Sequence, residues 1–167
     1  MARLVRLLAR AATKGLFVSN AVRVLVIADT HGHLPPNLEA LASGAHEIWH
    51  LGDVTAPSLL EAVCAVGPPV VIVRGNCDSN SEWPMTADLE RNGVRFHLIH
   101  IPPKFAPAGV HVLLHGHTHV PRDEVRGDVR FLNPGCVRRP NRGAPASVAH
   151  LEISATGELA WTRTLLR

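Results

Sequence analysis

Residues 22–32 read VRVLVIADTHG, an apolar and largely β-branched run followed at once by an aspartate, a threonine, a histidine and a glycine. The apolar run predicts a buried strand over residues 22–28. Asp29 and His31 then emerge at the carboxyl end of this strand, where ligands collect in α/β sheets. On its own the pattern is weak, because an aspartate at a strand end more often begins a turn.

The chain repeats this arrangement twice more. Further strands are expected over residues 46–50 and 70–73, and they run into the sequences GD at 52–53 and GNCD at 75–78. Three consecutive strands therefore each deliver an oxygen ligand to one rim of a sheet. Turns that form independently would have little reason to share these residue types.

Short helices are expected between these strands, over residues 37–43 and 57–66, and the alternation indicates the α/β class. After residue 80 the helical periodicity fades, so the second half should be mainly β. Its expected strands cover residues 94–99, 110–114, 122–126, 129–132, 147–153 and 158–165. Two pairs of these strands flank Gly127-Asp128 and residues 155–157, and they should form antiparallel hairpins.

The strongest motif is HGHTH at residues 115–119, again directly after an apolar run. Imidazoles at i and i+2 of an extended segment point to the same side, and the glycine lets the backbone approach a bound ion closely. A lone histidine here would more often be a hydrogen-bonded structural residue. Because the GHxH sequence follows three Asp/Asn strand ends, we interpret all four motifs as one metal site.

In the order DxH, GD, GNxD, H and GHxH, the chain resembles the calcineurin-like metallophosphoesterases, and among them the small YfcE-like phosphodiesterases. The resemblance covers nearly everything after residue 21 and extends to the Asn-Pro-Gly sequence at 133–135. It implies an α/β fold of two facing mixed β-sheets flanked by helices, the four-layer sandwich of metal-dependent phosphatases. It also implies hydrolysis of phosphodiesters by a hydroxide that bridges two metal ions, so that no protein nucleophile is needed.

The resemblance implies two metal sites that share one ligand. The first would be formed by Asp29, His31, Asp53 and His119, and the second by Asp53, Asn76, His100 and His117. Mixed carboxylate, amide and imidazole ligation suits Mn, which we expect, or Fe, Zn or Ni. Catalytic roles are expected for Asp53, Asn76, Cys77 and Asp78.

One ligand departs from the family pattern. Relatives usually continue the histidine at position 100 with a glycine, whereas Ile101 and two prolines follow it here. His97 is the alternative ligand, but side chains alternate along a strand, so His97 and His100 would normally point to opposite sides. We expect His100 to be the ligand, because it ends an apolar run as the other ligands do.

Three arginines, Arg138, Arg139 and Arg142, cluster in a loop that also contains proline and glycine. The resemblance implies that this loop approaches the site and that Arg138 and Arg139 bind a substrate phosphate in bidentate fashion. A solvated basic loop would account for the same charge pattern.

Several other residues are expected to be structural. His33 should lie in an exposed loop, and Cys64 in the core on the apolar face of the helix predicted over residues 57–66. Hydrogen-bonded positions in the strand walls are expected for His50, His111 and His115.

Composition limits the remaining choices. The chain has 167 residues, enough for one domain, and a formal charge of +3 that does not indicate nucleic acid. No apolar run approaches the ~20 residues of a membrane span. The three cysteines form no CxxC pair, which fits a reducing cytoplasm. We expect residues 21–167 to form the domain and residues 1–20 a basic extension, or an amphipathic helix that contacts a membrane surface or a partner.

Three functions remain open. The leading hypothesis is a phosphodiesterase that acts on a small-molecule or nucleotide-like phosphate ester. The second is a non-catalytic interaction scaffold of the same fold, like the retromer subunit, although every motif position here has a competent ligand. The third is a phosphomonoesterase or phosphoprotein phosphatase, but Cys77 stands where many such enzymes have a histidine that protonates the leaving group. Open sheet edges would also permit an oligomer.

Overall fold

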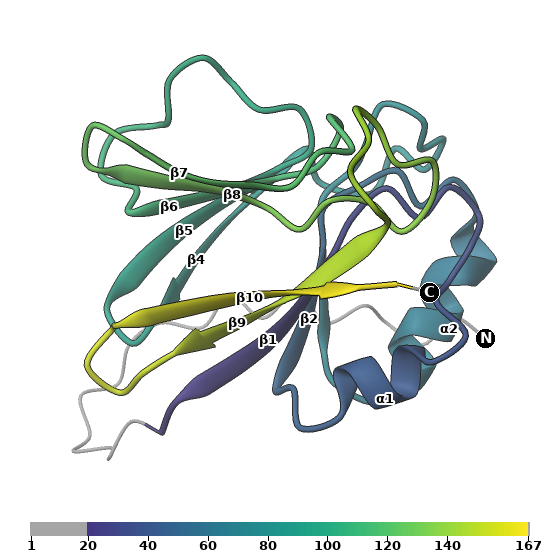
Figure 1. Ribbon diagram of the computed structural model, residues 1–167, viewed down its shortest axis with the longest axis horizontal. Coiled ribbons are helices and arrows are strands. Elements are labelled where there is room, and N and C mark those ends of the chain that lie inside the picture. Colours follow the sequence, from purple (N-terminus) through teal and green to yellow (C-terminus); the bar gives the residue numbers. More distant parts are fainter. Residues whose placement is uncertain (1–19, 167) are drawn as a thin grey trace.

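The computed structural model describes residues 20–166, which form two β-sheets that face each other, with two helices beside the first sheet (Figure 1). The expectation of two facing mixed sheets is confirmed. Four layers would need helices over the second sheet as well, and among these residues the helices pack on the first sheet only. The extension predicted at residues 1–20 lies, apart from Asn20, outside the described residues.

The first sheet supplies the parallel strands that end at the predicted rim. Its order is β10-β9-β1-β2-β3, with β1 (Val22–Ile27), β2 (Glu47–His50), β3 (Val70–Ile72), β9 (Ser147–Ile153) and β10 (Leu159–Leu165). The crossovers through α1 (Leu38–Ala42) and α2 (Pro57–Ala65) make β1, β2 and β3 parallel, whereas β9 runs antiparallel to β1. The carboxyl ends of β1, β2 and β3 therefore meet at one edge.

The second sheet has the order β4-β5-β6-β8-β7, with β4 (Thr86–Arg91), β5 (Val94–Ile99), β6 (Val112–His115), β7 (Arg122–Arg126) and β8 (Val129–Asn133). The predicted hairpins β7–β8 and β9–β10 are both present and antiparallel. Strand β4 was not predicted. Its signal is the Asn92-Gly93 turn to β5, where both residues have positive φ (49° and 78°), as a two-residue hairpin loop requires.

Each sheet contains a parallel strand pair, β1–β2 in the first and β5–β6 in the second, and the two pairs begin with the same hydrogen bonds. In β1–β2, the backbone N–H of Arg23 donates to Nδ1 of His46, and in β5–β6 the N–H of Arg95 donates to Nδ1 of His111. The arginine side chain in each case donates to the carbonyl of the glycine two residues before the histidine. His111 is thus hydrogen-bonded as predicted, although it is exposed. Because β2 and β6 are aligned in the same way against β1 and β5, they end at matching positions in their sheets.

Apolar side chains from the inner faces of both sheets form the main core, in which the Trp49 and Phe96 rings pack edge to face with centroids 5.2 Å apart. The other face of β1 and β2 packs against the helices through Leu41 and Val63. Cys64 was predicted to lie in this second core, but it is exposed. The short helix α2 buries only a narrow stripe, formed by Leu60 and Val63. Cys64 follows Val63 directly, so the helical turn carries its side chain away from this stripe and towards solvent.

No helix of the described residues is long and apolar enough to cross a bilayer.

Replacing Phe96, which is 1% exposed, tests whether contact between the sheets holds the fold together. Phe96→Ala should lower the free energy of unfolding of the metal-free protein by about 3–5 kcal/mol, because it removes a buried ring and leaves a cavity. The matched control is Phe105→Ala, at a position 75% exposed, which should change it by no more than about 0.5 kcal/mol. Denaturant unfolding measures both, and equal losses would contradict this account of the core.

Candidate metal centre

The residues predicted as metal ligands all lie in turns that follow strands of the two sheets. Asp29 and His31 follow β1, and Asp53 follows β2. Asn76 follows β3, and His100 follows β5 directly. The remaining two, His117 and His119, follow β6. Each sheet therefore contributes part of the site, and the seven residues meet only because the sheets face each other (Figure 1).

The first predicted set is brought together closely. One ligand atom from each of Asp29, His31, Asp53 and His119 can be chosen so that all four lie within 4.8 Å of one another. The Nε2 atoms of His31 and His119 are 3.2 Å apart. His31 Nε2 lies 3.6 Å from Asp53 Oδ2, and His119 Nε2 lies 3.4 Å from Asp29 Oδ1. Carboxylate and imidazole ligands in this arrangement fit a divalent transition-metal ion.

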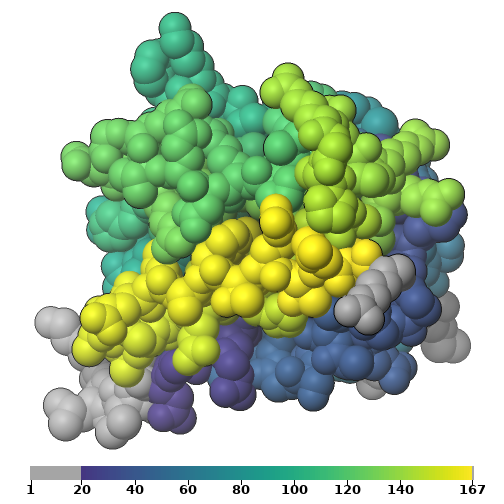
Figure 2. Space-filling view, viewed as in Figure 1, coloured from purple at the N-terminus to yellow at the C-terminus, as the bar shows by residue number. Residues whose placement is uncertain are grey.

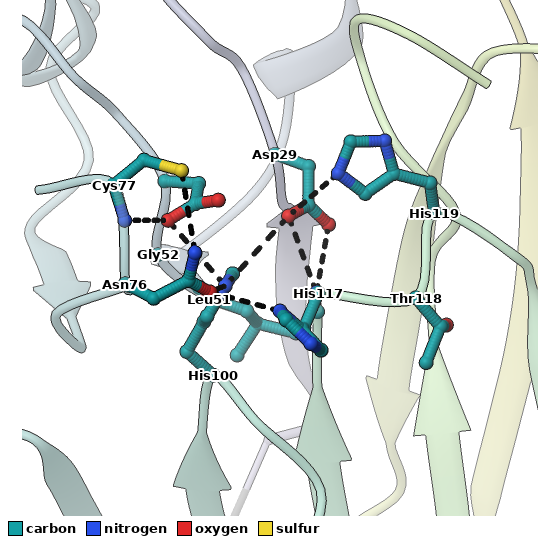
Figure 3. Close-up of polar contacts among 12 residues, drawn as sticks. Asp29, Leu51, Gly52, Asn76, Cys77, His100, His117, Thr118 and His119 are labelled. Atoms are coloured by element: carbon teal, nitrogen blue, oxygen red, sulfur yellow. Dashed lines mark hydrogen bonds and ion pairs between the residues drawn. The ribbon is translucent and has the colours of Figure 1, made fainter. Parts of the chain in front are cut away.

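The second predicted set converges on the side-chain oxygen of Asn76. This oxygen lies 3.0 Å from His100 Nε2 and 2.8 Å from His117 Nδ1, and the contact between Asn76 and His117 is drawn in Figure 3. His100 Nε2 is also 3.4 Å from Asp53 Oδ1. Asp53 thus faces both groups, which is the position required of a bridging ligand.

Two of the histidines have their ring nitrogens oriented for metal binding. Nδ1–H of His100 donates to the carbonyl of Leu51 (2.7 Å), and Nδ1–H of His119 donates to the carbonyl of Arg139 (2.6 Å). In the neutral rings these bonds leave the Nε2 lone pairs directed at the cluster, which is the usual orientation of a metal-binding histidine. Backbone carbonyls outside the site therefore fix the tautomers inside it.

The electrostatics of the cluster favour a positive charge at its centre. Burial alone would lower the pKa of His100, but its contacts with Asp53 and Leu51 raise it above the usual value. Hydrogen bonding to Asp29 likewise raises the pKa of His119. Burial would raise the pKa of Asp53, yet the contacts with His100 and the Cys77 amide hold it well below its usual range. For His31, burial lowers the pKa, and the charge of Arg139 adds to this lowering.

Backbone strain is concentrated at the same residues. Five of the seven predicted ligands have φ in the left-handed region: Asp29 (52°), His31 (43°), Asp53 (58°), His117 (67°) and His119 (55°). A residue other than glycine held there costs about 1–2 kcal/mol. Such strain persists where the surrounding structure enforces it, commonly at functional sites.

Three glycines leave the space that the ligands fill. A Cβ on Gly75 would overlap the Asp53 carboxylate, and a Cβ on Gly52 would lie 2.7 Å from Nδ1 of His100. A Cβ on Gly116 would lie 3.0 Å from Asp29 Oδ2. The glycines of the GD, GN and GHxH motifs are therefore explained by close packing against ligand side chains.

Asp78, whose predicted catalytic role stays a prediction, contacts the backbone of two turns at the site. Its Oδ2 accepts hydrogen bonds from the backbone N–H groups of Asp53 (2.9 Å) and Gly75 (2.8 Å), and its Oδ1 accepts one from Thr55 (2.7 Å). Both oxygens are occupied by backbone amides, so Asp78 braces the turns after β2 and β3 against each other.

Cys77 lies at the exposed edge of the cluster. Its N–H donates to Asp53 Oδ1 (2.8 Å), and Nδ2 of Asn76 donates to its Sγ (3.3 Å; Figure 3). Burial of the thiol and the neighbouring Asp53 raise its pKa to about 11. The thiol is therefore protonated near neutral pH and is not activated as a nucleophile.

Asn133 was noted in the sequence only as part of a motif, and no role was assigned to it. Its buried Nδ2 donates to the carbonyl of Gly116 (3.0 Å) and to Oγ1 of Thr118 (3.1 Å). These two residues flank His117, so Asn133 holds the strained turn that carries the predicted ligands. Nδ1–H of the buried His115 donates to the same Gly116 carbonyl (3.0 Å). The sequence feature that could have indicated this role is an asparagine at the end of a strand, directly before Pro134-Gly135.

The remaining histidines lie outside the cluster. His97 points to the outer side and contacts Asp88 Oδ1 (2.7 Å), so the alternation used to reject it as a ligand holds. His33 is exposed, as predicted. His50 is buried, with its Nε2 on Thr30 Oγ1 (3.1 Å) and its Nδ1 accepting from the Gly52 N–H (3.2 Å). Burial lowers the pKa of His50 to about 4, so this wall residue stays neutral.

Comparisons with known proteins point to one family. Its sequence model, the calcineurin-like phosphoesterase superfamily domain, matches residues 22–156. Phosphodiesterase YfcE of Escherichia coli K12 is 35% identical over 83% of this chain and 92% of its own length. A solved structure of E. coli YfcE, described as a phosphoesterase, aligns with a TM-score of 0.67 and 28% identity over 87% of this chain and all of that chain. Zinc-bound Vps29 from Entamoeba histolytica, 23% identical with a TM-score of 0.68 over 87% and 100% of the two chains, shares the fold.

Substitution of the shared carboxylate tests the metal centre. Asp53→Asn should lower the affinity for Mn²⁺ by more than about 100-fold, beyond the 10–100-fold typical of outer contacts, because one side chain faces both groups of ligands. His100→Ala should also weaken binding, whereas His97→Ala should leave the bound metal unchanged. Titration calorimetry and metal analysis measure these effects. If His97→Ala lost metal and His100→Ala kept it, the ligand assignment on β5 would be wrong.

Proposed function

Because this chain belongs to the calcineurin-like phosphoesterase superfamily, we propose that it is a metal-dependent phosphodiesterase. The observation that carries the proposal is the convergence of Asp29, His31, Asp53 and His119 within 4.8 Å, at the meeting edge of two sheets. The 35% identity with a protein named phosphodiesterase YfcE favours diesters as substrates. The physiological ester is of small-molecule or nucleotide-like size.

We propose two divalent metal ions, with Mn as the leading choice and Fe, Zn or Ni as alternatives. Asp29, His31, Asp53 and His119 would hold the first, and Asp53, Asn76, His100 and His117 the second. This division follows the two groups of contacts, which share Asp53. When bound, such a pair supplies a hydroxide at neutral pH and stabilises the charge that develops during in-line displacement at phosphorus.

The chain's own residues have distinct parts in this proposal. Asp53 and Asn76 are held rigidly by the turns that Asp78 braces, so they keep the reacting groups in line. Arg138 and Arg139 would bind the phosphate oxygens, since the Arg139 carbonyl already contacts His119. Cys77, at the exposed edge, stands where the leaving group would depart, and its thiol is a weak acid.

Two other functions of this fold are less well supported. A non-catalytic scaffold would not need five strained ligand residues or tautomers fixed by backbone carbonyls. A phosphomonoesterase or phosphoprotein phosphatase would be expected to protonate its leaving group, and Cys77 is poorly suited to that task.

We also propose that residues 21–167 form the catalytic domain, that residues 1–20 are an extension, and that the protein is cytoplasmic, in keeping with its three free cysteines.

Turnover of chromogenic esters tests the proposed activity. Purified protein reconstituted with Mn²⁺ should hydrolyse bis(p-nitrophenyl) phosphate, should lose activity with EDTA and should regain it with added Mn²⁺. Asp53→Asn should be inactive, because the shared ligand is lost. Activity on p-nitrophenyl phosphate should be lower than on the diester. Stoichiometric metal binding without turnover of any ester would support the scaffold instead, and preference for the monoester would support the third hypothesis.

Leaving-group dependence tests the part played by Cys77. A general acid contributes about 10²–10⁴ in rate, and a thiol with a raised pKa protonates a departing oxygen poorly. For a series of aryl phosphodiesters, log kcat/KM should therefore fall steeply as leaving-group pKa rises. Cys77→His should flatten the slope, and Cys77→Ser should change little. A flat slope in the wild type, with turnover lost in Cys77→Ser at full metal content, would show that the thiol takes part directly.

A further inference from the structure

The loop at residues 138–142, here called the arginine loop, is tied to the metal centre by its backbone. The N–H of Arg138 donates to the carbonyl of Asp29 (3.1 Å), and the carbonyl of Arg139 accepts the Nδ1–H of His119 (2.6 Å). Nδ2 of Asn141 donates to the carbonyl of Thr118 (3.2 Å). In Figure 2 the yellow-green atoms near residue 140 stand out from the surface. The loop is thus anchored at its base and exposed to solvent.

Two of the arginines in this loop occupy backbone positions that disfavour them. Arg139 has φ of 61° and Arg142 has φ of 51°, in the left-handed region. Each is strained relative to glycine, which takes up this conformation freely. A long cationic side chain at such a position suggests that the side chain itself is used.

The guanidinium groups of the arginine loop have no hydrogen-bond or ion-pair partner among residues 20–166. Eleven arginines fall in this range, and seven of them bond to a carboxylate, a carbonyl or a sulfur. The other four are Arg163, on strand β10, and the three of the arginine loop. Unpaired positive charge is therefore gathered beside the metal centre, to which the loop is tied by its backbone.

The arginine loop carries more positive charge than is needed to bind the phosphodiester group that is cleaved. A phosphodiester carries a single negative charge, whereas the loop offers three guanidinium groups that favour phosphate oxygens. We propose that the arginine loop, in addition to the contacts of Arg138 and Arg139 with the scissile phosphate, binds a second phosphate group, carried by the part of the substrate that is not the leaving group. The preferred substrates are then phosphodiesters with an additional terminal phosphate. This inference rests on the proposed function and specifies its substrate class.

Two esters with the same leaving group test the inference. Thymidine 5′-(p-nitrophenyl phosphate) and its 3′-phosphorylated derivative both release p-nitrophenolate and differ only in the second phosphate. The Mn-loaded protein should show a kcat/KM for the 3′-phosphorylated ester that is higher by about tenfold or more, the factor expected from one charge-assisted hydrogen bond. The preference should shrink as salt rises, because exposed charges are screened.

The variants separate the arginine loop from general surface charge. Combined Arg138→Gln, Arg139→Gln and Arg142→Gln should reduce the ratio of the two kcat/KM values to near one. Arg163→Gln, which removes the other unpaired arginine among residues 20–166, should keep the wild-type ratio. Equal metal content and equal unfolding midpoints in all proteins are required, so that a loss of the ratio reports recognition and not folding.

Binding gives a readout that does not depend on turnover. By calorimetry, thymidine 3′,5′-bisphosphate should bind the Mn-loaded protein more tightly than thymidine 5′-monophosphate, and the triple variant should lose this difference while Arg163→Gln keeps it. If the diesters are hydrolysed but neither the rates nor the affinities distinguish the second phosphate, the inference fails and the proposed function stands. If no ester is hydrolysed but the difference in affinity depends on the arginine loop, the binding site for the second phosphate stands, while the proposed function and the substrate preference that rests on it fail.

Discussion

The Nε2 atoms of His31 and His119 lie 3.2 Å apart, and two lone pairs cannot face each other at that distance without repulsion. His119 already uses its Nδ1–H on a backbone carbonyl, so its Nε2 lone pair faces the cluster and accepts either the Nε2–H of His31 or a bound cation. The carboxylates of Asp29 and Asp53 enclose the same space and favour the same charge. The cluster is therefore built around a positive charge, and most of the surrounding structure serves to hold it.

The two-sheet fold supplies this convergence, because neither sheet holds enough ligands alone. The first sheet brings one histidine, two carboxylates and an amide, while the second brings three histidines: His31, Asp29, Asp53 and Asn76 from the first, and His100, His117 and His119 from the second. Apolar packing between the sheets, centred on Trp49 and Phe96, sets the distance between the two groups. A metal ion that bound residues of both sheets would in turn strengthen their contact, since it binds the folded state only.

Contacts outside the cluster maintain its geometry at some energetic cost. Both carboxylate oxygens of Asp78 accept hydrogen bonds from backbone amides at the turns after β2 and β3. The buried Asn133 holds a third turn, the one that carries the GHxH motif. The turns themselves contain residues in left-handed conformations. Zinc-bound Vps29 has the same fold, but at 23% identity the similarity shows the fold alone. The braces and the strain are better explained by a site that must keep precise distances between its ligands.

The sequence by itself determined the strand-end motifs, the α/β class and which residues could bind a metal, because these depend on local periodicity and residue chemistry. It also separated His100 from His97 by simple alternation. It missed β4, although Asn92-Gly93 signalled the hairpin, since the strand is charged and half exposed. The family resemblance already implied that the arginine loop approaches the site. Only the tertiary structure decided that Asp78 braces two turns, that Asn133 supports the GHxH turn and that Cys64 is exposed. Each of these depends on contacts between segments far apart in the chain, which no local pattern encodes.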